Sequence, residues 1–340
     1  MATAVRAPRT AVDRERARPR LPGWSPGLGA VYRKELADHL SGHRFAILVA
    51  LVVVAGLAAM YVGARTLRDT LTQQSASDPF VFLRLFTTGG SSLPPFTFFV
   101  EFLGPLLGIA LAFDAINGER ARGTLSRLVS QPIYRDAVIN GKFLAGLAAL
   151  ALMIFALGGL VGGLGLLLTG VPPTLEEFLR LVVFLAVTVI YIGFWLSLAI
   201  LFSTVLRQTV ASALASLAVW LFFSVFASLL FGLVADAVAP VRDSQDAMQV
   251  LRNAQWNLAL NRLSPTLLYG EAVETLLNPQ VRALGPLLLE QVIGAVPGAP
   301  LPLGQSLLLI WPHLTGLAAA MLICFMIAYI AFMRQEIRAG

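Results

Sequence analysis

Residues 113–142, FDAINGERARGTLSRLVSQPIYRDAVINGK, form a polar island between two long apolar runs. Within it, Gly123 and Thr124 predict a turn followed by a helix N-cap, because a threonine hydroxyl can accept a hydrogen bond from the free N–H groups of a starting helix. Leu125, Leu128 and Val129 then fall on one helical face, and Pro132 predicts the end of that helix. The charged residues are mostly basic: Arg120, Arg122, Arg127, Arg135 and Lys142 against Asp114, Glu119 and Asp136. This pattern predicts a short amphipathic helix on a basic loop between two membrane spans, which is a plausible docking surface.

The composition excludes an ordinary soluble domain. Hydrophobic residues make up 57% of the chain and charged residues only 13%, with a mean hydropathy of +0.77, whereas a soluble domain carries about twice that charged fraction. The only cysteine, Cys324, lies in an apolar run, so neither an intrachain disulfide nor a thiolate metal cluster can form. We therefore expect an all-α integral membrane protein.

The apolar segments predict about six transmembrane helices in a single domain over residues 28–340. Each is long enough to cross a hydrocarbon core of about 30 Å at about 1.5 Å per residue. Between the last two, the two amphipathic stretches 263–279 and 283–297 are too short and too interrupted to span, so short helices outside the membrane are expected within an external segment, 235–305. The expected spans are residues 45–64, 94–116, 143–169, 179–202, 209–234 and 306–332, with a cytoplasmic loop at 117–142.

The distribution of charge predicts which side of the membrane each loop faces. Residues 1–27 are rich in arginine and proline and lack the apolar core of a signal peptide, so we expect a disordered cytoplasmic tail that contacts anionic lipid. Residues 28–40 place apolar side chains along one helical face that Glu35 interrupts; an interfacial helix fits, and a cytoplasmic extension of the first span is the alternative. Seventeen of the 25 Lys and Arg residues then lie on the cytoplasmic side. The prediction is a multi-pass plasma-membrane protein with both termini inside. The net charge of +6 thus reflects topology and not nucleic-acid binding.

The motifs of the polar island resemble those of the permease subunits of ABC-2 type ABC transporters. Within that family the chain is similar to the branch that includes the nitrous-oxide-reductase maturation permease and the gliding-motility permease. The resemblance rests on Glu119-Arg120, Gly123-Thr124-Leu125, Gln131-Pro132, Arg135 and Gly141-Lys142-Phe143. It implies that two permeases, as a homodimer or a heterodimer, pair with two copies of a separate ATPase subunit. The expected ATPase-coupling residues are Glu119, Arg120, Gly123, Thr124, Leu125, Arg127 and Leu128.

Several catalytic motifs are missing from the sequence. It contains no G-x-x-x-x-G-K-[ST] phosphate loop, no H-E-x-x-H zinc pair and no G-x-S-x-G nucleophile turn. His39 and His43 are four residues apart, but with no carboxylate partner evident we interpret them as structural. We expect no catalytic, cofactor or metal site in this chain, and ATPase activity in the partner subunit.

Glu101 is the ionisable residue that stands out inside an expected span. It lies about 10 Å along the helix from the Pro pair that opens the second span, at about 1.5 Å per residue. An ionisable side chain at such a depth is costly, which makes Glu101 a candidate pathway residue. The alternative is a position in the outer interfacial zone, near the positive end of the helix dipole.

Two functions of different classes remain open. The first is the permease subunit of an ABC-2 exporter, coupled to ATP hydrolysis in another chain. The second is a non-transporting membrane scaffold or assembly factor that binds an extracytoplasmic partner through 235–305. A secondary transporter is disfavoured, because the spans carry few buried charges and no evident inverted repeat. The substrate stays open between a lipid-like compound and metal or sulfur for an extracytoplasmic enzyme, the latter implied by the resemblance.

Overall fold

The computed structural model describes residues 27–71, 80–90, 93–125, 133–170, 172–243, 245–281, 284–285 and 300–335, with the side chains of 68–71 excepted. These residues form helices and no strands. The expected tail, most of the stretch 283–297, and the coupling residues Arg127 and Leu128 lie outside the described residues.

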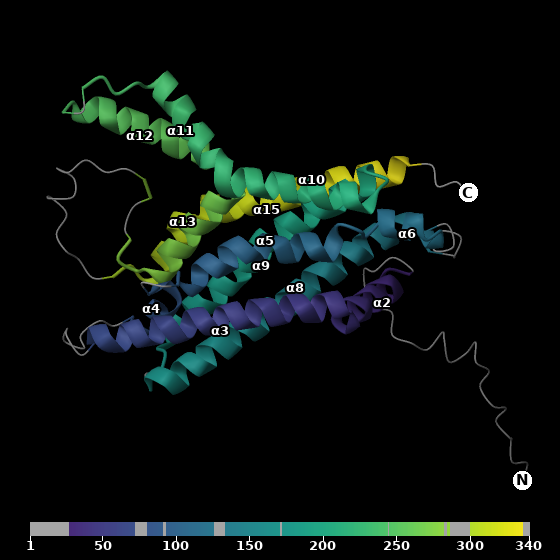
Figure 1. Cartoon of the computed structure of the whole chain (residues 1–340), viewed down its shortest axis with the longest axis horizontal. Helices are drawn as coiled ribbons and strands as arrows, with labels where there is room; N and C mark the ends of the chain where they lie inside the picture. Colours follow the sequence, from purple (N-terminus) through teal and green to yellow (C-terminus); the bar gives the residue numbers. More distant parts are fainter. Residues whose placement is uncertain are drawn as a thin grey trace, which may run out of the picture.

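Six helical segments of the described chain are long and apolar enough to cross a membrane, which confirms the predicted all-α membrane fold. They lie side by side in one bundle (Figure 1). The spans are α3 (His43–Leu71, apolar to Leu67), α5 (Phe96–Ala112) continued by α6 (Asn117–Ala121), α8 (Arg135–Thr169), α9 (Leu175–Val205), the run of α10 (Thr209–Leu221), π-helix η1 (Phe222–Phe226) and α11 (Ala227–Val238), and α15 (Leu303–Arg334).

Helix α9 is the centre of the bundle. It is buried over 72% of its most apolar stretch, whereas the fifth span is buried over only 6%. Its start is fixed by a capping box, in which the Thr174 hydroxyl accepts from the N–H of Glu177 and the Glu177 carboxylate accepts from the N–H of Thr174. Trp195 and Tyr191 are fully buried on it. The second, third, fifth and sixth spans therefore contact α9, whereas α3 packs against α5 and α8.

The structure also contains short helices, one of which was expected. Helix α13 (Pro265–Leu277) matches the first predicted amphipathic stretch, whereas α12 (Ala247–Asn261) was not predicted. Residues 81–87 were expected in an external loop but form α4 (Val81–Thr87), because its apolar residues pack into the core, where Leu83 and Phe86 are fully buried. Figure 1 shows α11 and α12 side by side, extending away from the bundle.

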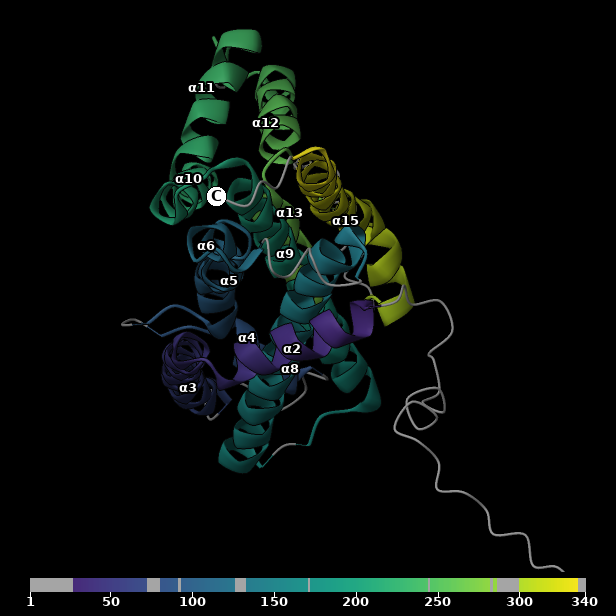
Figure 2. The same cartoon turned by 90° about the vertical axis from the view of Figure 1, so that its right-hand side faces the viewer.

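The polar island is folded more tightly than the sequence suggests. Residues 117–121 continue the second span as α6, and residues 135–142 are the first two turns of α8. Of the expected loop of 117–142, the described residues that lie outside α6 and α8 are 122–125 and 133–134. Helix α2 (Leu28–Ser41) lies across the start of α8 in Figure 2, and Val31 packs against Gly141. The prediction of a loop was wrong for residues 117–121 and 135–142. The charges of this stretch favour solvent in the sequence, whereas Lys142 is buried.

Arg180 joins three elements at the opposite end of the bundle. It is one of the Lys and Arg residues that the sequence places on the outer side of the membrane, and its side chain is fully buried. Its guanidinium donates to the carbonyl of Leu276 at 2.9 Å and to Ser306 Oγ at 3.2 Å, and it forms an ion pair with Glu176 at 3.1 Å. A buried guanidinium needs such partners, since an isolated buried charge is very costly. Arg180 therefore ties α9 to α13 and α15.

Candidate functional site

A buried lysine joins three helices at the end of the bundle where α2 lies. Lys142, only 5% exposed, comes from the second turn of α8. Its Nζ lies 3.0 Å from Glu35 Oε2 of α2 and 2.8 Å from Glu119 Oε1 of α6. Removing one member of a buried ion pair leaves an uncompensated charge, so such a cluster fixes the relative position of the elements that carry it. We call Lys34, Glu35, Glu119 and Lys142 the charge cluster.

The charge cluster reaches the surface through Lys34. Its Nζ lies 2.9 Å from Glu35 Oε1 and 3.1 Å from Asp38 Oδ2. Burial by itself would raise the pKa of Glu35, but the Lys142 and Lys34 ammonium groups outweigh it and lower the pKa below its usual range. Glu35 is therefore a carboxylate at neutral pH, and it holds both ammonium groups.

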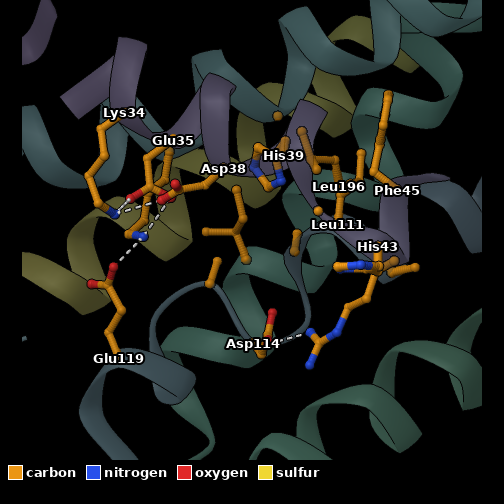
Figure 3. A pocket seen from close by; sticks show the side chains of 18 of the residues that line it. Lys34, Glu35, Asp38, His39, His43, Phe45, Leu111, Asp114, Glu119 and Leu196 are labelled. Carbon is orange, nitrogen blue, oxygen red and sulfur yellow. Dashed lines mark hydrogen bonds and ion pairs between the residues drawn. The ribbon is translucent and has the colours of Figure 1, made fainter. Parts of the chain in front are cut away.

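A cavity of about 460 Å³ lies beside the charge cluster (Figure 3). On one side it is lined by the charged residues of α2, α6 and α8, and on the other by apolar side chains that include Leu111 and Leu196. The Arg44 guanidinium lies 2.6 Å from Asp114 Oδ2 and 5.6 Å from the ring centroid of Phe113. This ion pair connects the start of α3 with the chain between α5 and α6.

His39 of α2 also lines this cavity. Burial lowers the pKa of His39 below its ordinary value of 6.5, against the opposing effect of Glu35. Lys142 also lowers it, while Asp38 and Asp114 act in the same direction as Glu35. The imidazole is therefore neutral at neutral pH, and its protonation would add a charge to a partly desolvated site.

Helix α6 is attached to the C-terminal end of α9 as well. Ser203 Oγ accepts from the N–H of Ile116 at 2.9 Å and of Asn117 at 3.2 Å. The Asn117 side-chain amide donates to the carbonyls of Leu206 and Gln208, each at 3.4 Å. These hydrogen bonds fix the base of the polar island on the short connection between α9 and α10.

The C-terminal end of α15 contacts the same region. The Arg120 guanidinium donates to the side chain of Gln335, whose amide donates in turn to the carbonyl of Thr204 at 2.7 Å. Elements α2, α6, α8, α9 and α15 thus meet within a few hydrogen bonds of one another. A displacement of α6 would be transmitted to all of them.

The predicted coupling residues divide into a buried and an exposed group. Glu119 and Leu125 are buried at 8% and 2% exposure, so they hold the segment in place and do not present a surface. Residues 121–124 are exposed. Gly123 has φ +67°, in the left-handed region that favours glycine, and the Thr124 hydroxyl donates to the carbonyl of Glu119 at 3.2 Å. Within the described part of the polar island, the turn at 121–124 is therefore a stretch of consecutive exposed residues that a partner can touch, and Tyr134 is exposed as well.

Lys142 and Glu35 were not predicted as site residues. Lys142 was counted among the cations of a solvated loop. Glu35 was noted because it interrupts the apolar face of residues 28–40, and that interruption is the signal that points to a buried partner. The pairing itself joins residues 107 positions apart, which no local pattern reveals. Within the described residues, no group of three or more His, Cys, Asp and Glu residues is placed to hold a metal ion.

Glu101 lies at the other end of the second span, facing α13. A Cβ atom on Gly270 would lie 3.5 Å from Glu101 Oε1, so the carboxylate is beside the backbone of α13. The Tyr191 hydroxyl donates to the Glu101 backbone carbonyl at 3.0 Å, and the Tyr191 ring stacks on Tyr269 at 4.2 Å between centroids. Glu101 thus sits where α5, α9 and α13 meet.

Six candidate spans with α9 at their centre, and a polar island fixed between the second and third spans, define a multi-pass membrane protein. The chain belongs to the ABC-2 transporter family: the family model described as ABC-2 family transporter protein matches residues 29–337. It is 29% identical over 250 residues to a probable ABC transporter permease protein, NosY, of Pseudomonas aeruginosa, which covers 72% of this chain and 80% of that protein. It is also 29% identical over 142 residues to a probable NosY of Stutzerimonas stutzeri, covering 42% of this chain and 46% of that protein.

Proposed function

We propose that this chain is the permease subunit of an ABC exporter in which a separate ATPase subunit docks on the exposed turn at 121–124. The observation that carries the proposal is the attachment of α6 at its base. Lys142 links α6 to α2 and α8, and Ser203 links it to α9. A force applied at the turn is therefore passed directly to several spans. The chain acts mechanically in this account, and ATP is hydrolysed in the partner.

The orientation of the chain follows from the same proposal. The end with α2, α6 and the charge cluster faces the cytoplasm, where the ATPase is, and both termini lie inside. The α11–α12 hairpin then faces outward. The excess of Lys and Arg at the α2 end supports this orientation by the positive-inside rule. Two copies of the chain, as a homodimer or with a related permease, would complete the transporter.

Co-purification tests the docking of an ATPase. The full-length tagged chain is purified in mild detergent from its own cells, beside two charge-reversal variants. Arg122→Glu alters an exposed arginine within the turn, and Arg252→Glu alters an exposed arginine on α12 at the other end of the molecule. We expect an ATPase subunit with a phosphate-binding loop to accompany the unmodified chain and Arg252→Glu, and to be lost from Arg122→Glu. An intact, monodisperse chain with no ATPase would favour the scaffold function instead.

We also propose that Glu101 lines the route of the substrate between α5 and α13. An ionisable side chain inside a span points to a pathway. The test is a Glu101→Cys variant in a Cys324→Ser background, labelled from outside with a membrane-impermeant thiol reagent in the ATP-bound and nucleotide-free states of the complex. Labelling in at least one state is the expected result. A thiol that stays unreactive in every state would contradict the pathway role.

A further inference from the structure

A row of asparagines lies along the seam between α11 and α12. Asn253, Asn257 and Asn261 are four residues apart on α12, so they share one face of the helix. Because α12 runs antiparallel to α11, they lie opposite Asp236, Gly232 and Ser228 in that order. Asn253 Nδ2 is 2.8 Å from Asp236 Oδ1, a Cβ atom on Gly232 would lie 3.5 Å from Asn257 Nδ2, and Ser228 lines the same groove as Asn261.

The hydrogen bonds of this row fix the orientation of each amide. Asn253 Nδ2 donates to Asp236 Oδ1 and to the carbonyl of Ala239, both of which can only accept. Asn261 Nδ2 donates to the carbonyl of Asn257 at 2.9 Å and to its Oδ1 at 2.7 Å. Each side-chain nitrogen and oxygen of the three amides is thereby assigned.

The remaining polar atoms of the row alternate between acceptor and donor. Among the described residues, no hydrogen-bond partner is found for Asn253 Oδ1, Asn257 Nδ2 or Asn261 Oδ1. Successive asparagines are about 6 Å apart along the helix, from four residues at about 1.5 Å each. The row therefore presents an acceptor, a donor and an acceptor at a regular spacing.

The three asparagines line a groove of about 610 Å³. Gly232 and Ser228 leave the Asn257 and Asn261 end of the seam open, because neither has a large side chain. The rest of the described lining is apolar or small, namely Ala254, Leu258, Leu267 and Gly285, and no charged side chain is part of it. The groove thus suits a ligand that is uncharged and that offers both hydrogen-bond donors and acceptors.

We propose that this groove binds an extended, uncharged polypeptide segment. In an extended chain, the backbone N–H and C=O groups of every second residue point in the same direction. These groups therefore recur about every 6.6 Å along the chain. That repeat matches the spacing of about 6 Å between successive asparagines. The distance from Asn253 to Asn261, about 12 Å, accommodates about four residues of extended chain. The apolar lining then contacts small or β-branched side chains. Among the described residues that line the groove there is no aromatic side chain to stack on a sugar ring, which favours a peptide over a carbohydrate.

A direct binding measurement on the full-length chain in detergent tests this proposal. The probe is a fluorescent, end-capped peptide of alternating alanine and threonine, and binding is followed by fluorescence anisotropy. Asn257→Leu removes the donor of the row while keeping a similar side-chain volume. The matched control is Gln255→Leu, which removes an exposed amide from the same helix but outside the groove. Ser228→Trp fills the groove from an exposed position on α11 and leaves every asparagine in place.

The expected result is saturable binding to the unmodified chain and to Gln255→Leu. Asn257→Leu should weaken it by about tenfold, the effect of losing about one hydrogen bond, and Ser228→Trp should abolish it. A failure of the unmodified chain to bind the peptide overturns the proposal. If Gln255→Leu weakens peptide binding as much as Asn257→Leu does, the proposal is overturned as well. Competition of maltotetraose with the peptide would also overturn it, in favour of a carbohydrate ligand. None of these outcomes depends on an ATPase or on transport.

Discussion

Lys142 is the residue on which the packing of the polar island depends. Its side chain is 5% exposed and holds two carboxylates from two other helices. Lys142→Met removes the ammonium but keeps most of the volume, leaving Glu35 and Glu119 with one positive partner fewer. We expect a loss of about 3–5 kcal/mol in the free energy of unfolding, as is typical when one member of a buried ion pair is removed.

Thermal unfolding of the purified protein measures this effect. Lys34→Met is the matched control, because Lys34 is 53% exposed and contacts the same Glu35. Exposed ion pairs contribute less than about 1 kcal/mol, so the control should unfold close to the unmodified protein. Equal melting temperatures for both variants would show that the cluster does not hold the helices together.

His39 predicts a pH dependence of stability. Its pKa in the folded protein lies below the ordinary 6.5 because of burial, so the unfolded chain binds its proton more readily. The stabilising contribution is therefore fully present above pH 6.5 and is lost as the pH falls through the folded-state pKa. Glu35, whose pKa is lowered from 4.5, loses its contribution only in more acidic solution.

The melting temperature is measured between about pH 7 and about pH 5, because histidine titrates in that interval. Comparison of the unmodified protein with His39→Gln separates the effect of His39 from that of the other two histidines. We expect the melting temperature of the unmodified protein to fall on acidification, and that of His39→Gln to fall less. If the two melting curves stay parallel, the pKa of His39 is the same in the folded and the unfolded chain, and the prediction is contradicted.

At the scale of elements, the contact of α5 with α9 requires a glycine. A Cβ atom on Gly108 would lie 2.7 Å from the carbonyl oxygen of Ile192 and 3.0 Å from the N–H nitrogen of Leu196. Both are backbone atoms of the central helix, so a side chain at this position forces the two helices apart. Gly108→Ala should lower stability by about 1–3 kcal/mol, the usual cost of overpacking.

The control for Gly108→Ala lies on another span. Gly159 of α8 has no described atom within 4 Å of its ideal Cβ position. Alanine is a better helix former than glycine, so Gly159→Ala should leave the melting temperature unchanged or raise it slightly. A comparable loss in both variants would mean that helix propensity or lipid contacts, and not the approach of α5 to α9, explain the effect.

The sequence predicted the long helices better than the short ones. A span is marked by about twenty consecutive apolar residues, which is a local property. Helix α12 was missed because its apolar and polar residues are mixed. The contacts of its asparagine side chains are with α11, and the local sequence does not reveal them. Arg180 and Lys142 were misplaced for a related reason: each is buried by partners far away in the sequence, and charge alone predicts exposure. Glu35 carried a local signal, since it breaks an apolar face.

At the scale of the whole molecule, the two ends of the bundle differ in construction. The α2 end is held by ion pairs and hydrogen bonds among five elements, and the turn at 121–124 is part of its exposed surface. The other end carries the long α11–α12 hairpin, in which α11 is the last part of the fifth span and α12 lies beside it, away from the packed bundle (Figure 1). In the proposed function, the ATPase subunit docks at the α2 end, and the end with α12 faces outward.

Site-specific photo-crosslinking in cells tests this assignment most directly. A photoreactive amino acid is introduced at Ala121, the exposed first residue of the turn, or at Gln255, which is exposed on α12. After irradiation, the adducts of the full-length chain are identified by mass spectrometry. We predict that Ala121 captures an ATPase subunit with a phosphate-binding loop and that Gln255 does not. Capture of that ATPase from Gln255, or no ATPase adduct from Ala121 in a stably folded chain, would contradict the proposed coupling.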